Sequence, residues 1–194
     1  MPKRTAYPIS ADEILKEEFN YIAQTAAQAN EDRARVSSFY FVSVGSLIAA
    51  LFGAQFLNLD VLALEFKLAI SAVFFLLTLL GASVILQLAR LRLAWYESAL
   101  AMNQIKEFAV EHNQNLAEAF RWTTRTLPPR YKTASISFYQ AREAAILSGV
   151  TCFAGTYFAQ YAFRLNGWMN WLIAVICGVL TVFLQIAAYK RALR

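Results

Sequence analysis

Apolar positions in this chain fall into four long runs that contain no Asp, Glu, Lys, Arg or His. The runs cover residues 36–59, 68–89, 144–163 and 168–189. Each has about 20 residues, enough to cross a hydrocarbon core of about 30 Å at about 1.5 Å per helical residue. The pattern therefore predicts an all-α membrane protein with about four transmembrane helices. Short polar connections, residues 60–67 and the Asn-Gly turn at 166–167, group them into two hairpins.

The polar stretch before the first run has the pattern of an amphipathic helix. Ser10 and Glu13 have the spacing of a capping box, in which each side chain satisfies a free backbone N–H at the helix start. Apolar residues then recur at three- and four-residue intervals: Ile14, Leu15, Phe19, Ile22 and Ala26. We expect this face to pack on another helix.

The segment between the hairpins, residues 90–143, is polar but keeps a helical pattern at its start. Apolar residues recur from Leu91 to Phe108, including Trp95, which predicts a helix that continues out of the membrane. We expect a turn near residues 111–115, a second helical segment to about Thr126, a break at Pro128-Pro129 and a short helix from Ala134. The predicted organisation is a cytoplasmic amphipathic helix, a transmembrane hairpin, a cytoplasmic helical segment, a second hairpin and a cytoplasmic tail, at residues 1–35, 36–89, 90–143, 144–189 and 190–194.

Composition agrees with a lipid environment. The hydrophobic fraction is 58% and the charged fraction is 16%, whereas soluble domains have about half apolar and about a quarter charged residues. Cys152 and Cys177 lie inside apolar runs, where a thiol behaves as a small hydrophobic group.

The distribution of Lys and Arg predicts the orientation. The N-terminal stretch, the middle segment and the tail carry most of the basic residues, while the two hairpin tips carry only Lys67 and Arg164. Because cytoplasmic loops are enriched in basic residues, we expect both termini and the middle segment in the cytoplasm. Trp168 and Trp171 then lie at the outer membrane–water interface, which aromatic rings favour.

Residues that carry catalytic or metal chemistry are sparse. The apolar runs lack the acidic, basic and histidine side chains typical of proton relays and intramembrane hydrolases. His112 has no second His or Cys nearby, so we expect no metal site, and we expect no cofactor. An enzyme would need a polar cytoplasmic set, for which the candidates are Glu97, Asn103, Glu107 and His112.

Small residues mark the faces on which membrane helices approach closely. Gly45, Ala49 and Gly53 are four residues apart, and shorter patterns include Gly149 and Gly178. The pattern favours packing within one subunit, and the alternative is contact between subunits.

Two kinds of polar residue suggest further contacts. Gln55 and Gln160 lie near the outer ends of their runs, and Gln87 and Gln185 near the inner ends, so each pair is a candidate for an interhelical hydrogen bond or for lining a polar pathway.

Basic residues mixed with aromatics after the first hairpin indicate contact with anionic lipid headgroups rather than nucleic acid: Arg121, Arg125, Arg130 and Lys132.

The order of elements in residues 10–115 resembles the SLATT-type membrane modules of bacteria. In both, an amphipathic helix leads into a transmembrane hairpin that continues into another helix, here through Leu91-Arg92-Leu93-Ala94-Trp95-Tyr96. The resemblance implies a bacterial membrane effector that disrupts membranes as a pore, and it does not cover the second hairpin.

Together these features lead to one main functional hypothesis and two alternatives. The main hypothesis is a non-enzymatic protein of the bacterial inner membrane that self-associates as a homo-oligomer among membrane lipids, as a pore or membrane effector. The first alternative is an accessory or scaffold subunit that docks on another membrane protein. The second alternative is a small channel or transporter without intramembrane charges.

Overall fold

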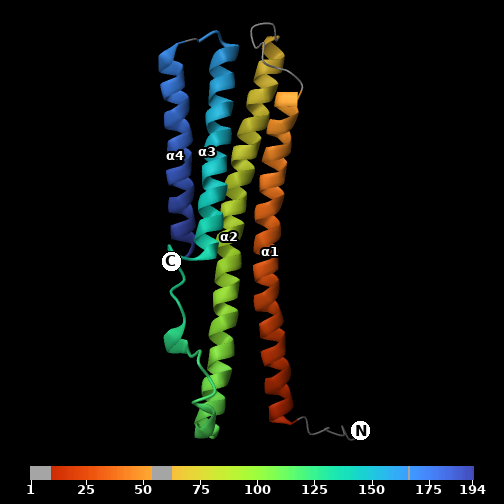
Figure 1. Ribbon diagram of the computed structural model, residues 1–194, viewed down its shortest axis with the longest axis vertical. Helices are drawn as coiled ribbons and strands as arrows, with labels where there is room; N and C mark the ends of the chain where they lie inside the picture. Colours follow the sequence, from red (N-terminus) through yellow and green to blue (C-terminus); the bar gives the residue numbers. More distant parts are fainter. Residues whose placement is uncertain (1–9, 54–62, 166) are drawn as a thin grey trace, which may run out of the picture.

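The computed structural model describes residues 10–53, 63–165 and 167–194, which form four long helices (Figure 1). The helices are α1 (Ala11–Gly53), α2 (Leu64–His112), α3 (Ile136–Ala162) and α4 (Trp168–Ala192), and two 3-10 turns, η2 (Gln114–Leu116) and η3 (Thr124–Thr126), lie between α2 and α3. No β-strand occurs in these described ranges. The predicted all-helical architecture is confirmed.

The first two helices begin and continue as the sequence pattern predicts. α1 begins directly after Ser10, whose carbonyl accepts hydrogen bonds from the backbone N–H of Glu13 (3.1 Å) and of Ile14 (3.2 Å). α2 is one helix of 49 residues that passes through the second apolar run and on to His112. At about 1.5 Å per residue it is about 70 Å long.

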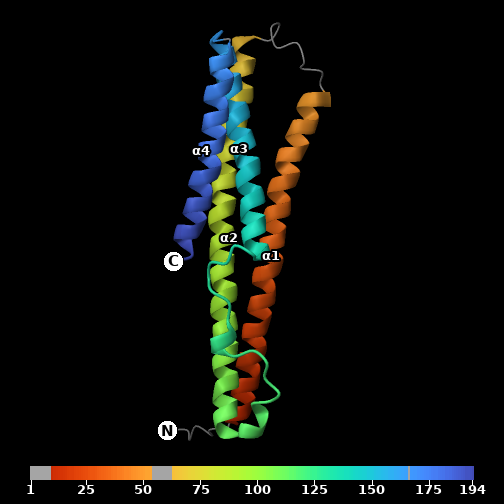
Figure 2. The same cartoon turned by 60° about the vertical axis from the view of Figure 1, so that its left-hand side comes forward.

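The four helices lie side by side in one half of the molecule, and only two of them reach the other half (Figure 1). α2 packs mainly on α3 and α1, and α3 packs mainly on α2 and α4. Residues 11–35 of α1 and 90–112 of α2 extend beyond α3 and α4, and we call this two-helix extension the stalk. Towards its C-terminal end α1 leans away from the other helices (Figure 2).

The segment from 113 to 135 differs from the prediction of a second helix ending near Thr126. It contains only the two 3-10 turns and runs back along the stalk (Figure 2). The Asn113 side chain accepts a hydrogen bond from the backbone N–H of Asn115 (3.2 Å), which favours a turn directly after α2. The short helix expected from Ala134 is instead the first turn of α3, which Ser135 caps and which continues unbroken into the third apolar run.

Three of the described helices are long and apolar enough to cross a membrane, namely the Asp12–Leu51 part of α1, α2 and α4. α3 is less apolar because several of its residues carry hydroxyl groups. These hydroxyls meet polar groups of α2: Ser148 Oγ donates to the carbonyl of Thr78 (3.1 Å), and Thr151 Oγ1 lies 2.9 Å from Thr78 Oγ1. α3 therefore lies where neighbouring helices satisfy its polar groups.

Large apolar side chains cover the outer surface of the bundle. Those exposed along the apolar runs include Phe39, Val42, Leu76, Leu79, Phe183 and Leu184. Soluble monomers rarely expose contiguous apolar surface of this extent. The surface of the helical bundle is thus compatible with lipid.

Candidate functional site

Close helix packing within the chain is concentrated where α3 crosses α4. A Cβ atom added at Gly149 would lie 2.5 Å from Val182 Cγ2 and 2.8 Å from the carbonyl oxygen of Gly178. A Cβ at Gly178 would lie 2.8 Å from the carbonyl oxygen of Gly149. These two glycines, selected from the sequence, therefore face each other and allow the two backbones to approach.

A second crossing joins three helices at a glycine that the sequence analysis did not select. A Cβ at Gly81 would lie 2.5 Å from Tyr40 Oη and 2.7 Å from Ser148 Oγ. The Tyr40 hydroxyl, on α1, donates to the carbonyl of Leu77 on α2 (3.2 Å). Gly81 is the only glycine of the second apolar run, and that was the available signal.

The small-residue face of α1 is not used inside the subunit. No atom lies within 4 Å of a Cβ built at Gly45, and Ser46, Ala49 and Ala50 are exposed. Gly53 ends α1 at the edge of the described range. The favoured prediction, packing of this face against another helix of the same subunit, is wrong for Gly45 and Ala49, because α1 leans away from the bundle at this level (Figure 2).

The predicted pairing of Gln87 with Gln185 does not form. Gln185 makes an interhelical hydrogen bond, but its Nε2 donates to Ser148 Oγ (2.7 Å) rather than to Gln87. Gln87 is exposed and donates to Ser83 of its own helix (3.3 Å). The Oε1 of Gln160 is buried and has no hydrogen-bond partner among the described residues. Gln55 lies outside the described residues, so its pairing with Gln160 stays a prediction.

In the stalk, α1 presents most of its predicted apolar face to α2. Leu15, Phe19 and Ile22 are half-buried, and the face continues through buried Ala26 and Ala29. The Lys106 ammonium of α2 lies 5.9 Å from the centre of the Phe19 ring. Ile14, by contrast, is 55% exposed and lies outside this face. Trp95 is half-buried, and the guanidinium of Arg92 stacks on it, 4.5 Å from the centre of the Trp95 ring.

The four basic residues expected at lipid headgroups are placed at different levels of the stalk. Arg125 lies in the η3 turn, which is hydrogen-bonded to Glu107. Arg121 lies two residues before Thr123, whose backbone carbonyl accepts a hydrogen bond from Asn103. These α2 residues lie about 20–25 Å along the helix from the end of the second apolar run. Arg130 lies nearer to that end, with its guanidinium 5.2 Å from the centre of the Tyr96 ring, and Lys132 is exposed. Of these four residues, only Arg130 and Lys132 remain in our headgroup hypothesis.

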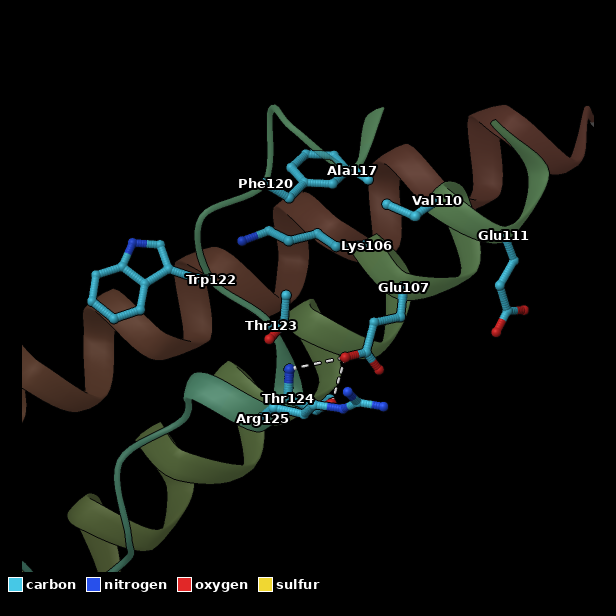
Figure 3. A pocket seen from close by; sticks show the side chains of 10 residues that line it. All are labelled: Lys106, Glu107, Val110, Glu111, Ala117, Phe120, Trp122, Thr123, Thr124 and Arg125. Carbon is cyan, nitrogen blue, oxygen red and sulfur yellow. Dashed lines mark hydrogen bonds between the residues drawn. The ribbon is translucent and has the colours of Figure 1, made fainter. Parts of the chain in front are cut away.

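A pocket lies near the free end of the stalk, between the last turns of α2 and the returning segment (Figure 3). Its volume is about 590 Å³, and it combines charged and aromatic side chains, among them Lys106, Glu107, Phe120, Trp122 and Arg125. Glu107 fixes its wall, because one carboxylate oxygen accepts the backbone N–H of Thr124 (3.0 Å) and also the hydroxyl of Thr124. The pocket is open to the surface and is not an enclosed cavity.

These hydrogen bonds make the attachment of the returning segment sensitive to acid. The Thr124 hydroxyl and N–H, with a smaller contribution from the charge of Arg125, lower the pKa of Glu107 below its ordinary value of 4.5. A lowered folded-state pKa means that the contribution to stability is present above the unfolded-state pKa and is lost as the pH falls through the folded-state pKa.

We therefore expect η3 to stay attached at pH 5 and to detach with a midpoint below pH 4.5. The fluorescence of Trp122, in a variant whose other tryptophans are Phe, reports the transition. Glu107→Gln should loosen the turn already at neutral pH and remove the transition, whereas Glu111→Gln is the control with the same change of charge in the same pocket. An identical midpoint in both variants would contradict the assignment.

The polar residues considered for catalysis do not converge on one point. Asn103 Nδ2 donates to the backbone carbonyl of Thr123 (3.0 Å), Glu107 holds Thr124, and His112 Nδ1 contacts the carbonyl of Phe108 (2.8 Å). Glu97 is exposed. In the described part of the chain no group of three or more His, Cys, Asp or Glu side chains is arranged to hold a metal ion. The hydrogen bonds of Asn103 and Glu107 attach the returning segment to the stalk end, and that of His112 stays within its own helix.

Comparisons with protein-family models, with curated proteins and with solved structures gave no match to this chain. The functional argument therefore depends on the geometry described above.

Proposed function

We propose that this protein is a four-span integral membrane protein of the bacterial inner membrane, with α3 as the fourth span. Two contacts support the assignment of α3. Ser71 Oγ of α2 donates to the carbonyl of Gly155 (2.8 Å), and the hydroxyls of Thr78 and Thr151 lie 2.9 Å apart. α3 thus runs beside α2 at the level of the second apolar run, and it shares whatever environment that run occupies.

In this proposal both termini and the stalk are cytoplasmic. The described basic residues of α1, of the middle segment and of the tail are located at the stalk end of the apolar runs, which agrees with the enrichment of cytoplasmic loops in Lys and Arg. The stalk then holds its pocket about 30 Å from the bilayer surface.

The function that the geometry supports best is self-assembly in the membrane as a non-enzymatic effector. The observation that supports it is the uncovered glycine face of α1. Gly81, Gly149, Gly155 and Gly178 each lie within contact distance of a neighbouring helix, while Gly45 has no neighbour within 4 Å. Membrane helices associate through close backbone packing at small residues, because lipid tails are as apolar as Leu side chains. A second copy of the chain covers this face in the assembled particle.

Disulfide trapping tests the assembly. In a background with Cys152→Ala and Cys177→Ala, a cysteine at Ala49 should form a cross-linked dimer in membranes, because the α1 faces of two copies meet there. Gly45→Leu in the same background should reduce the dimer several-fold by holding the backbones apart.

The matched control is Leu76→Cys, which places an exposed cysteine on α2 at a similar depth. Dimer formation at Leu76→Cys equal to that at Ala49→Cys would indicate random collision and overturn the proposed interface. Ion leakage from vesicles that contain the assembly cross-linked through Ala49→Cys would identify it as a pore, and tight vesicles would identify a scaffold.

A further inference from the structure

Two arginines from different helices, one buried and one half-buried, lie where the stalk meets the bundle. Arg92 of α2 is only 7% exposed. Its Nε donates to the backbone carbonyl of Arg130 (3.3 Å), its Nη2 donates to that of Pro129 (3.4 Å), and its guanidinium stacks on Trp95 at 4.5 Å. Both hydrogen bonds end on neutral carbonyl groups, so the positive charge of Arg92 is not neutralised.

Arg33 of α1 lies close to Arg92 and lacks a full set of partners. Its Nη2 donates to the side chain of Asn30, but its Nε is buried with no hydrogen-bond partner. Contacts between α1 and α2 on either side, Phe19 with Lys106 and Tyr40 with Leu77, place Arg33 on the same stretch of the helix pair as Arg92. Burial lowers the pKa of Arg33, and the charge of Arg92 lowers it further. Among the described residues the one ion pair joins Arg35 to Asp32, and it involves neither of these arginines.

Two further cations lie on or against the segment that Arg92 binds. The Lys190 ammonium of α4 lies 5.5 Å from the centre of the Tyr131 ring, and the Arg130 guanidinium lies 5.2 Å from that of Tyr96. Two positive charges held together away from water are costly unless an anion joins them. The guanidinium group matches phosphate oxygens in geometry and forms charge-assisted hydrogen bonds with them.

We infer that Arg33 and Arg92 form a binding site for an anionic phosphate group, with the free Nε–H of Arg33 as one of its donors. Both arginines lie three residues from an apolar run, Arg33 before residue 36 and Arg92 after residue 89. This is the level of the inner headgroups in the proposed orientation, so the headgroup of an anionic phospholipid is one source of the phosphate and inorganic phosphate is the other. The lipid source rests on the proposed membrane insertion, whereas the site itself does not.

Arg33→Gln tests the site, and Arg35→Gln is its matched control. Both remove one positive charge from the same helix, two residues apart, but Arg35 is 79% exposed and pairs with Asp32. The full-length protein is purified in a neutral detergent, and its melting temperature is measured with phosphatidylglycerol, with phosphatidylcholine and with inorganic phosphate. We expect wild type and Arg35→Gln to be stabilised by a phosphate-bearing anion, with an affinity about tenfold weaker in Arg33→Gln, as for a lost hydrogen bond to a charged group.

The additives distinguish the sources. Stabilisation by phosphatidylglycerol but not by inorganic phosphate, lost in Arg33→Gln, supports a lipid site. Stabilisation by inorganic phosphate, lost in the same variant, supports a site for the free anion. If neither anion stabilises the wild type beyond phosphatidylcholine, or if Arg33→Gln and Arg35→Gln weaken the effect equally, the inference is overturned. Failure of the α1 cross-link leaves these readouts unchanged.

Discussion

Replacing Gly149 with Leu is expected to disrupt the bundle itself. The nearest atoms to a Cβ at this position are Val182 Cγ2 at 2.5 Å and the backbone oxygen of Gly178 at 2.8 Å, and a backbone oxygen cannot change rotamer to make room. Overpacking of this kind costs up to about 3 kcal/mol. We expect the melting temperature of the detergent-solubilised protein to fall by about 5–10 °C, measured by thermal size-exclusion chromatography.

Gly45→Leu is the control, because it introduces the same side chain at a glycine with nothing within 4 Å. The wild type and both variants are compared in a detergent that dissociates the assembly, because loss of the assembly would itself change the apparent stability. Under these conditions we expect Gly45→Leu to leave the melting temperature unchanged. Equal destabilisation by both variants would show that helix propensity or bulk hydrophobicity, rather than the α3–α4 contact, causes the effect.

Charging the α1 face of the stalk should separate its two helices. Phe19 and Ile22 are half-buried against α2, and replacing both with Asp places two carboxylates on an apolar contact that offers them no full set of partners. We expect backbone amides of residues 15–30 to exchange with deuterium at least tenfold faster, because the isolated amphipathic helix is only marginally stable. The helices of the bundle should keep their protection.

A control with the same change in charge is available on the same helix. Ile14 and Tyr21 are 55% and 66% exposed, so Ile14→Asp combined with Tyr21→Asp should leave exchange in the stalk nearly unchanged. If this pair loosens the stalk as much as the first, the added charge rather than the lost packing is responsible.

The helices were accessible from the sequence because charge and apolar residues are segregated along it. The three runs that the structure describes throughout each lie within one helix, except that Phe163 is the C-cap residue of α3. The recurring apolar residues after Arg90 correctly predicted that α2 continues past the second run. Three helices meet the composition expected of a membrane span. α3 does not meet it, because it contains polar residues such as Ser148 and Thr151. These residues face α2. Which neighbouring helix satisfies a hydroxyl group depends on the tertiary structure.

Where the sequence analysis failed, a tertiary partner decided the outcome. The second cytoplasmic helix does not form, since Asn103 and Glu107 of α2 bind the backbone of Thr123 and Thr124 and hold that segment as a turn. Gln185 bonds to Ser148 on α3 instead of Gln87. These contacts join residues far apart in the chain, and residue spacing within one helix carries no information about them.

Gly45 and Arg33 also show that a sequence pattern does not identify the tertiary partner of a residue. A glycine repeat in the sequence indicates close packing but does not say against what, and only the arrangement of helices leaves Gly45 uncovered and Gly149 covered. Arg33 and Arg92 contribute to the positive-inside pattern like any other basic residue, yet the fold buries Arg92 and half-buries Arg33 on the same stretch of the helix pair. The SLATT-like order of elements stays a prediction.

The mass of the gently solubilised particle, measured by native mass spectrometry, tests self-assembly through α1 most directly. The account predicts a homo-oligomer for the wild-type chain and for Arg35→Gln, and a monomer of 21.8 kDa for Gly45→Leu. A wild-type monomer, or an oligomer that Gly45→Leu leaves intact, would contradict it.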